Sequence, residues 1–233
     1  MRSSIDVIFV PQGAEYQAVY RGLRSIANQT AEIVPVPVGP RAVSRFLQDW
    51  HLNSRQFWQE PVQVLMMGLC GSLSPRHAVG DAVIYQSCYD GSCSPNVPPK
   101  LCDLQLSQSL AQGLPGSVTA VTAVTCDRIL CKASEKRQLA QRYPATVVDM
   151  EGFTALALLQ NYKMAVSMLR VVSDAAEHDL PDLNAALSES GQLLPWPMAM
   201  GMIRRPRASL RLIRGSLQGL KQLEQLAAQL GGR

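Results

Sequence analysis

Acidic residues follow three apolar runs of the sequence, close to the point where each run ends. They are Glu15, Asp149, Glu151 and Asp174. A carboxyl group that holds a proton can donate it to a leaving group, and an ionised carboxylate can stabilise positive charge that develops in a transition state. One such acid by itself also suits a helix cap or complements a helix dipole. Three such positions in one chain favour a reaction site.

The elements that must position these acids alternate along the chain. Seven apolar runs rich in β-branched residues predict strands: Ile5–Val10, Ile33–Val38, Val62–Met67, Ala82–Tyr85, Val118–Val124, Ala145–Met150 and Ala165–Val172. Helical patterns lie between many of them: Glu15–Ile26, Arg41–Trp50, Leu104–Gln112, Ser134–Tyr143 and Gly152–Asn161. The alternation predicts a single α/β domain with a mixed, mostly parallel central sheet flanked by helices. Ligands of such sheets bind outside the carboxyl ends of the strands, so the acids should meet at one edge.

Two further segments stand near predicted strand ends. Gly68 and Gly71 follow the third strand, and Val79-Gly80-Asp81 comes soon after them. Glycines after a strand allow a ligand to approach the backbone closely. Their spacing is not the dinucleotide-binding pattern, which disfavours a nucleotide-dependent oxidoreductase. The polar, proline-rich segment Ser87–Lys100 predicts a loop long enough for a lid or an interface.

Composition excludes several classes of protein. The chain has 233 residues, of which 47% are hydrophobic and 17% charged, so it is not intrinsically disordered. No apolar run approaches a membrane span or a signal-peptide core, which predicts a cytoplasmic protein. The six cysteines contain no CxxC pair and no zinc spacing, which predicts reduced thiols and no metal site.

Positive charge is concentrated at the C-terminal end. The net charge is +4, but residues 204–233 contain seven basic residues and one acid, whereas residues 1–203 have a small acidic excess. This asymmetry does not indicate a nucleic-acid binder. Apolar residues recur in this tail at helical spacing: Leu210, Ile213, Leu217, Leu220, Leu223, Ala227 and Leu230. Two interpretations stay open, a helix packed on the body or a basic surface that rests on anionic lipid.

Three motifs in fixed order resemble the nucleoside phosphorylase and nucleosidase superfamily. They are Gly68/Gly71 followed by Val79-Gly80-Asp81, then Asp149-Met150-Glu151, then Arg170 followed by Ser173-Asp174. The similarity extends from residue 5 to about residue 181. It implies a phosphorylase/hydrolase-like catalytic domain over residues 1–181, with a helical, basic extension over residues 182–233. The implied reaction is cleavage of an N-glycosidic bond by hydrolysis or phosphorolysis.

The resemblance also implies roles for individual residues. Asp174 would protonate N7 of the purine, which requires a raised pKa, and Ser173 would orient it. Glu151 would bind ribose hydroxyls, Met150 would pack on the sugar, and Glu15 would activate the attacking water. The remaining substrate contacts implied are Gly68, Leu69, Cys70, Gly71, Ile129, Val148 and Asp149. The Gly68–Ser72 loop would line the nucleophile side, and no metal or cofactor is implied beyond inorganic phosphate as a co-substrate.

Departures from the nucleosidase pattern leave the substrate open. Ile129 stands where an aromatic residue usually stacks on adenine, and Leu69 stands where a small hydroxyl residue often follows the first glycine. The phosphate signature of the hexameric phosphorylases is missing. Arg41 is a candidate anion ligand, but we favour its interpretation as ordinary surface or interface charge.

The segments after Asp174 resemble the hopanoid-associated phosphorylases, which implies release of adenine from adenosylhopane and contact with the membrane surface. The alternatives are a methylthioadenosine/S-adenosylhomocysteine nucleosidase and a non-catalytic nucleoside-binding module. The superfamily implies a homo-oligomer, with a dimer expected first.

Overall fold

The structure, a computed structural model, describes residues 5–24, 31–54, 61–114, 116, 118–186, 188 and 195–230. Its strands are β1 (Val7–Pro11), β2 (Glu32–Val36), β3 (Gln63–Ser72), β4 (Ala82–Asp90), β5 (Lys100–Leu101), β6 (Thr119–Thr125), β7 (Val147–Asp149) and β8 (Ala165–Asp174). Its helices are α1 (Ala14–Arg24), α2 (Pro40–Ser54), α3 (Leu104–Gly113), α4 (Ala133–Arg142), α5 (Gly152–Asn161), the short 3-10 turn η2 (Asn184–Ala186), α6 (Pro195–Arg204) and α7 (Pro206–Leu230).

The strands form one mixed sheet. Among the described residues its order is β2-β1-β3-β7-β6-β4-β5, and β8 pairs with both β3 and β4. The pairs β1–β2, β1–β3, β3–β8, β4–β6 and β6–β7 are parallel, whereas β3–β7, β4–β5 and β4–β8 are antiparallel. The strands β3, β8, β4, β6 and β7 therefore pair in a closed ring. The predicted α/β domain with a mixed, mostly parallel sheet is confirmed.

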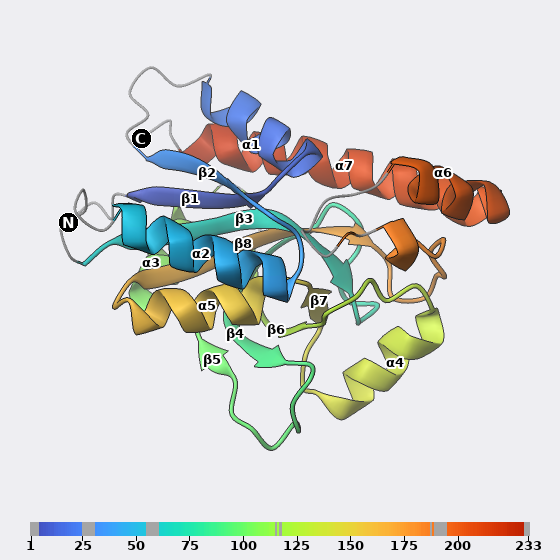
Figure 1. Ribbon diagram of the computed structural model, residues 1–233, viewed down its shortest axis with the longest axis horizontal. Coiled ribbons are helices and arrows are strands. Elements are labelled where there is room, and N and C mark those ends of the chain that lie inside the picture. Colours follow the sequence, from blue (N-terminus) through green and yellow to red (C-terminus); the bar gives the residue numbers. More distant parts are fainter. Residues whose placement is uncertain are drawn as a thin grey trace.

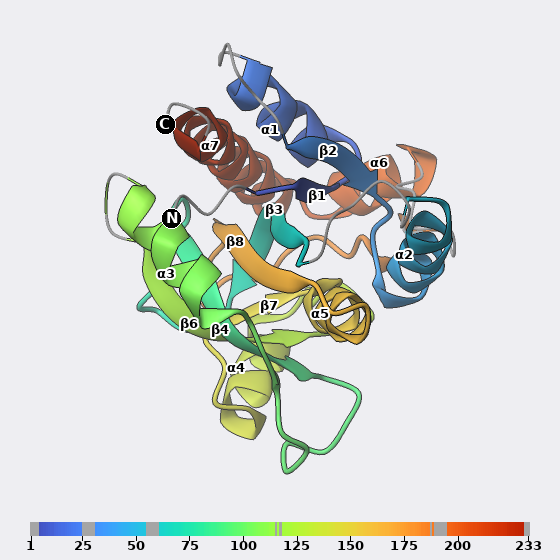
Figure 2. The ribbon, with the colours of Figure 1, turned by 90° about the vertical axis from the view of Figure 1, so that its left-hand side faces the viewer.

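Helices cover both faces of this sheet, as Figure 1 and Figure 2 show. One apolar core joins the strands to α2 and α5 through Leu47 and Leu156. A second core joins them to α1, α3 and α7 through Leu23, Leu110 and Leu226. Strands enclosed on both faces need apolar side chains in both directions, and this explains their nearly continuous apolar sequences.

β3 and β4 each run five residues beyond the end that their apolar sequences predict. β3 continues from the expected end at Met67 to Ser72, so the expected glycine loop is strand. Its extension pairs with β8 on one side and β7 on the other, and these long-range pairings override the low strand preference of glycine. β4 likewise continues to Asp90, and the expected loop Ser87–Lys100 is reduced to residues 91–99.

The C-terminal helix packs on the body by only part of its expected apolar stripe. Leu223 and Ala227 are fully buried in the core that α7 shares with α1, whereas Leu210, Ile213 and Leu217 are exposed. The expectation of one continuous stripe is wrong for a geometric reason. At about 100° per residue, the 20 residues from Leu210 to Leu230 rotate about 200° beyond five full turns, so the stripe winds around the helix.

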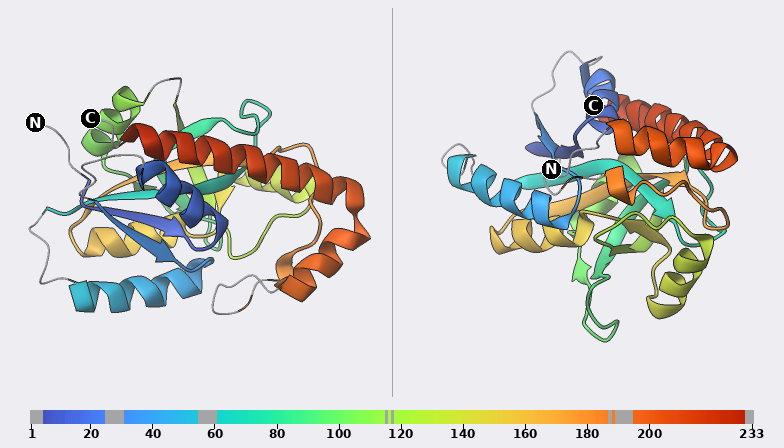
Figure 3. Two further views of the ribbon diagram at one scale, coloured as in Figure 1. Left: turned by 90° about the horizontal axis from the view of Figure 1, so that it is seen from above. Right: turned by 45° about the vertical axis from the view of Figure 1, so that its right-hand side comes forward.

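Figure 3 shows α7 along one side of the molecule, with α6 turning away at its N-terminal end. None of the helices in the described ranges is long and apolar enough to cross a membrane. The domain boundary expected after residue 181 stays a prediction. The end of the first predicted helix, residues 25 and 26, lies outside the described residues.

Candidate active site

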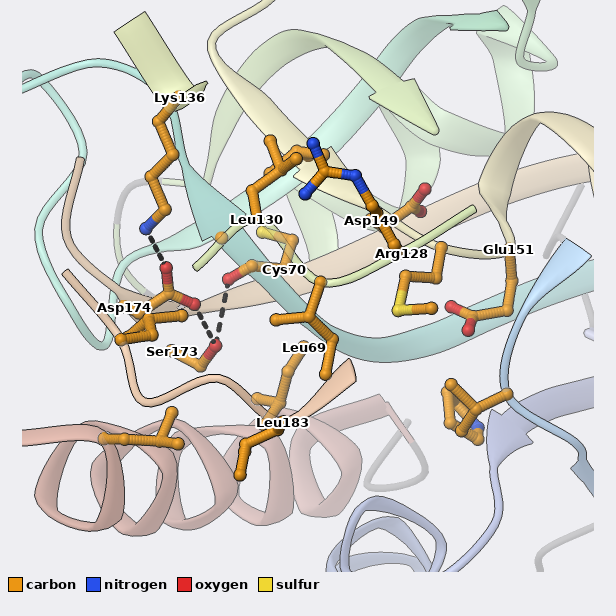
Figure 4. A pocket seen from close by; sticks show the side chains of 18 of the residues that line it. Leu69, Cys70, Arg128, Leu130, Lys136, Asp149, Glu151, Ser173, Asp174 and Leu183 are labelled. Atoms are coloured by element: carbon orange, nitrogen blue, oxygen red, sulfur yellow. Dashed lines mark hydrogen bonds and ion pairs between the residues drawn. The ribbon is translucent and has the colours of Figure 1, made fainter. Parts of the chain in front are cut away.

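A cavity lies at the carboxyl ends of β1, β3 and β8, with α4 and α7 at its border (Figure 4). Its volume is about 240 Å³, which leaves room for a small-molecule ligand. The expected site residues that line it are Glu15, Leu69, Cys70, Gly71, Ile129, Val148, Asp149, Met150, Glu151, Ser173 and Asp174. The structure thus brings the acidic strand ends together, while the role of each residue stays a prediction.

A bulge between β3 and β8 positions Ser173 and Asp174. Cys70 pairs with Val172 and Gly71 pairs with Asp174, so Ser173 is an extra residue in β8. Bulges bend a strand and re-aim its side chains. The Ser173 hydroxyl lies 3.0 Å from Asp174 Oδ1 and 3.2 Å from the Cys70 carbonyl oxygen (Figure 4). A Cβ atom on Gly71 would lie 3.1 Å from Asp174 Oδ2, so glycine leaves room for this carboxyl group.

A buried lysine faces the other oxygen of Asp174, and the sequence analysis missed it. Lys136 Nζ forms an ion pair with Asp174 Oδ2 and donates a hydrogen bond of 2.8 Å to the Ala175 carbonyl (Figure 4). The side chain of Lys136 is 1% exposed and that of Asp174 is 13% exposed, so each charge depends on the other. Lys136 lies in the first turn of α4, where the helix dipole disfavours a cation. That unfavourable placement is the only hint in the sequence.

Glu15 lies in the first turn of α1, directly after a turn in which Gly13 has a φ of +92°. The backbone N–H of Leu69 donates a hydrogen bond to Glu15 Oε1. Burial raises the pKa of Glu15 to about 7, although the Leu69 N–H and the Arg170 guanidinium oppose the rise. A base with a pKa near neutral can take a proton from water efficiently.

Arg170 lies fully buried next to Glu15. Its Nη2 is 3.4 Å from Asp149 Oδ2, and none of its guanidinium nitrogens has a hydrogen-bond acceptor within the described residues. A Cβ atom on Gly68 would overlap Arg170 Nη1 and lie 2.9 Å from Glu15 Oε1. Gly68 thus leaves room for the carboxylate and the guanidinium to approach each other. It is not among the residues that line the cavity, and its expected contact with substrate stays a prediction.

The carboxylate of Asp149 is buried, and its partners are other groups of the protein. It accepts hydrogen bonds from Thr125 Oγ1 at 2.6 Å, from the Gly152 N–H at 3.1 Å and from the Tyr85 hydroxyl at 3.3 Å. Its side chain is 1% exposed. Together with the ion pair to Arg170, these contacts indicate that Asp149 positions other groups of the site.

Glu151 is the N-cap residue of α5 and lies on the side of the cavity away from Lys136 (Figure 4). Its Oε1 accepts a hydrogen bond of 2.8 Å from the Gly39 N–H. Burial raises the pKa of Glu151, and the charges of Asp149 and Glu15 add to the rise. A hydrogen-bond donor or a positive charge in the cavity would stabilise the ionised form of this carboxyl group.

Apolar side chains form the rest of the cavity wall. Those that the sequence analysis did not single out include Leu130, Leu180, Leu183 and Leu212. Leu212 belongs to α7, so the C-terminal helix contributes to the site. One turn further, Gly215 packs so closely that a Cβ atom would overlap the Ser173 carbonyl oxygen. No periodic pattern in the sequence identifies this contact, because it joins positions 42 residues apart.

Comparison with known proteins identifies the family of the chain. The sequence model of the Phosphorylase superfamily matches residues 40–192. None of the curated proteins matches the chain in sequence.

Solved structures share the fold at low sequence identity. A putative 5′-methylthioadenosine/S-adenosylhomocysteine nucleosidase from Francisella philomiragia is 13% identical, with a TM-score of 0.69 over 97% of this chain and 98% of that chain. The 5′-methylthioadenosine/S-adenosylhomocysteine nucleosidase of Helicobacter pylori is 14% identical, with a TM-score of 0.67 over the same shares. Native futalosine hydrolase of Helicobacter pylori is 13% identical, with a TM-score of 0.62 over 92% of this chain and 97% of that chain.

Proposed function

Because the chain belongs to the phosphorylase superfamily, we propose that it cleaves the N-glycosidic bond of an adenosine-type nucleoside and releases adenine. The observation that carries the proposal is the distribution of charge in one cavity. A buried proton donor pair, Lys136 and Asp174, lies at one end, and Glu151 lies across the cavity from it (Figure 4). Breaking an N-glycosidic bond places negative charge on the base and positive charge on the sugar, and the two ends match these charges.

The proton for the leaving base comes from the Lys136–Asp174 pair. As the bond between C1′ and the purine nitrogen breaks, its electrons go to the base and N7 gains a proton. Lys136 Nζ, hydrogen-bonded to the Asp174 carboxylate, supplies this proton through that carboxylate, which leaves Lys136 neutral until it takes a proton from solvent. This pair differs from the isolated, protonated Asp174 expected from the sequence, because the ammonium group can store the proton.

The two glutamates act on the sugar and on the attacking water. Glu151 accepts hydrogen bonds from ribose hydroxyls and stabilises the positive charge that develops on the sugar. Glu15, whose pKa is about 7, takes a proton from the attacking water while the oxygen forms a bond to C1′. Arg170 keeps this carboxylate ionised for part of the pH range, because its positive charge opposes the effect of burial.

Adenosylhopane is the substrate that we propose first. Its support is the resemblance of the segments after Asp174 and the apolar wall contributed by Leu180, Leu183 and Leu212. Methylthioadenosine or S-adenosylhomocysteine is the alternative, supported by the shared fold of the nucleosidases. A non-catalytic nucleoside-binding module is disfavoured, because a binder does not need a buried proton donor pair at the site.

The choice between water and phosphate as the nucleophile rests on the groups around Glu15. A general base with a near-neutral pKa favours water. Arg41 is exposed and is not among the residues that line the cavity, so it lends no support to a phosphate cradle there. We therefore propose hydrolysis first, with inorganic phosphate as the alternative co-substrate.

The decisive experiment measures adenine release from a panel of 5′-substituted adenosines, with and without phosphate. Wild-type protein should release adenine from at least one member. Asp174→Asn should lose this release by at least 100-fold while still binding the nucleoside. Absence of release from the whole panel, a lipid-linked adenosine included, would refute the proposed activity. Release that requires phosphate would replace hydrolysis by phosphorolysis.

A further inference from the structure

Large apolar side chains are exposed along α6 and α7, away from the cavity. Their exposed fractions are 43% for Met200, 73% for Ile203, 48% for Leu210, 43% for Ile213 and 62% for Leu217. Exposing one such residue is common, but a contiguous group of them marks an interaction surface. We call these five residues and the arginines between them the α6–α7 face.

Arginines share this face with the apolar residues. Arg204, Arg207, Arg211 and Arg214 are exposed, and none has an acidic partner within the described part of the chain. Arg205 is exposed as well and pairs with Asp179 at 3.3 Å. No acidic residue occurs anywhere from 195 to 223. The face is therefore both apolar and strongly positive.

Helix geometry puts the two kinds of residue side by side. On α7, Leu210, Ile213 and Leu217 recur every three or four residues, and so do the arginines at 207, 211 and 214. The two rows lie roughly 90° apart around the helix axis, and the buried residues Gly215 and Gly219 point to the opposite side. Figure 3 shows α7 along one side of the molecule, with α6 at its N-terminal end.

We propose that the α6–α7 face docks on an anionic phospholipid bilayer. A basic amphipathic helix lies in the bilayer interface with its apolar side chains among the acyl chains and its cations among the headgroups. A second copy of this chain is a poorer partner, because two such faces would bring arginines against arginines with no acidic residue to pair them.

Docking would bring the cavity close to the lipid. Leu212 lies on the inner side of α7 and lines the cavity, while Leu210 and Ile213 lie on the outer side. The cavity wall is thus about one helix diameter, or about 10 Å, from the proposed lipid contact. If the proposed function holds, the enzyme could take a nucleoside that is anchored in the bilayer by an apolar tail.

Vesicle cosedimentation of the full chain tests the docking without any substrate. The vesicles contain phosphatidylcholine alone or with 30% phosphatidylglycerol. Wild-type protein should bind the anionic vesicles at least tenfold more tightly than the neutral ones, and added salt should weaken the binding. Failure to bind anionic vesicles would overturn the inference and would leave the proposed bond cleavage untouched, because no turnover is measured.

Matched variants identify the surface. The triple variants Leu210→Ser/Ile213→Ser/Leu217→Ser and Arg207→Gln/Arg211→Gln/Arg214→Gln should each lose at least tenfold in vesicle affinity. A control of equal size replaces Leu52, Leu101 and Leu104 by Ser, since these side chains are also exposed but lie elsewhere. It should bind like wild type. If the control variant loses as much vesicle affinity as the α7 variants, the proposal is contradicted. It is also contradicted if wild-type protein forms a dimer that only the α7 variants disrupt and does not bind vesicles. Circular dichroism and adenine release from a water-soluble nucleoside check that the variants are folded.

Discussion

Replacing Glu15 by Gln should slow adenine release and, at the same time, raise the free energy of unfolding at neutral and alkaline pH. Burial raises the pKa of Glu15 from an ordinary value of 4.5 to about 7. One pKa unit corresponds to about 1.4 kcal/mol, so ionised Glu15 destabilises the folded state by about 3 kcal/mol. Gln has the same shape and its amide oxygen can still accept the Leu69 N–H, but it carries no charge.

The pH dependence of this effect has a definite sign. The folded protein keeps the Glu15 proton up to a pH of about 7, whereas the unfolded chain releases it near 4.5. The free energy of unfolding of the wild type therefore loses this contribution as the pH rises from 4.5 to 7. We expect Glu15→Gln and wild type to be equally stable at pH 4.5. At pH 8 the variant should be more stable by about 3 kcal/mol.

Urea denaturation at several pH values measures the stability, and adenine release measures the activity. Glu15→Gln should be slower by a factor of about 10² to 10⁴, because it cannot accept a proton from the nucleophile. Glu32→Gln, at an exposed position, is the control and should change neither quantity. A stability difference between variant and wild type that is the same at pH 4.5 and pH 8 would refute the burial argument. Full activity of the variant would refute the role as a base.

Three further predictions follow from the same contacts. In the wild type, kcat/KM should fall as the pH decreases below about 7, because protonated Glu15 cannot act as a base; a flat profile down to pH 5 would contradict this. Lys136→Met should lower the free energy of unfolding by about 3 kcal/mol and slow base release at least 100-fold, since it leaves a buried carboxylate unpaired. Lys132→Met, at an exposed ion pair, should do neither, and similar losses in both variants would argue against the buried pair. Gly215→Ala should lower the free energy of unfolding by about 1–3 kcal/mol and reduce activity, because the added methyl group overlaps the Ser173 carbonyl oxygen. Urea denaturation measures the stability and adenine release measures the activity. A variant that matches wild type in both would contradict the close packing.

The sequence predicts helices and strands well where burial of apolar side chains alone decides the local structure. Strands such as β1 are recognisable because residues enclosed between two helical layers must be apolar on both sides. The fifth helix, Gly152–Asn161, has the bounds that its pattern predicts. Prediction fails at the end of β3, since pairing with β7 and β8 carries the strand through Gly68 and Gly71. Such pairing joins segments far apart in the chain and leaves no local pattern.

The same contrast applies to the site and to the tail. The sequence by itself determined that acids stand at strand ends, and sheet geometry then requires those ends to meet at one edge. Only the tertiary structure decided that Lys136, which is 38 residues from Asp174, pairs with it in the interior. It also decided that one part of α7 packs on α1 while another part faces solvent with its leucines and arginines. The physical reason is that charge pairing and burial depend on which surfaces meet in space, whereas periodicity records only the neighbours within one element.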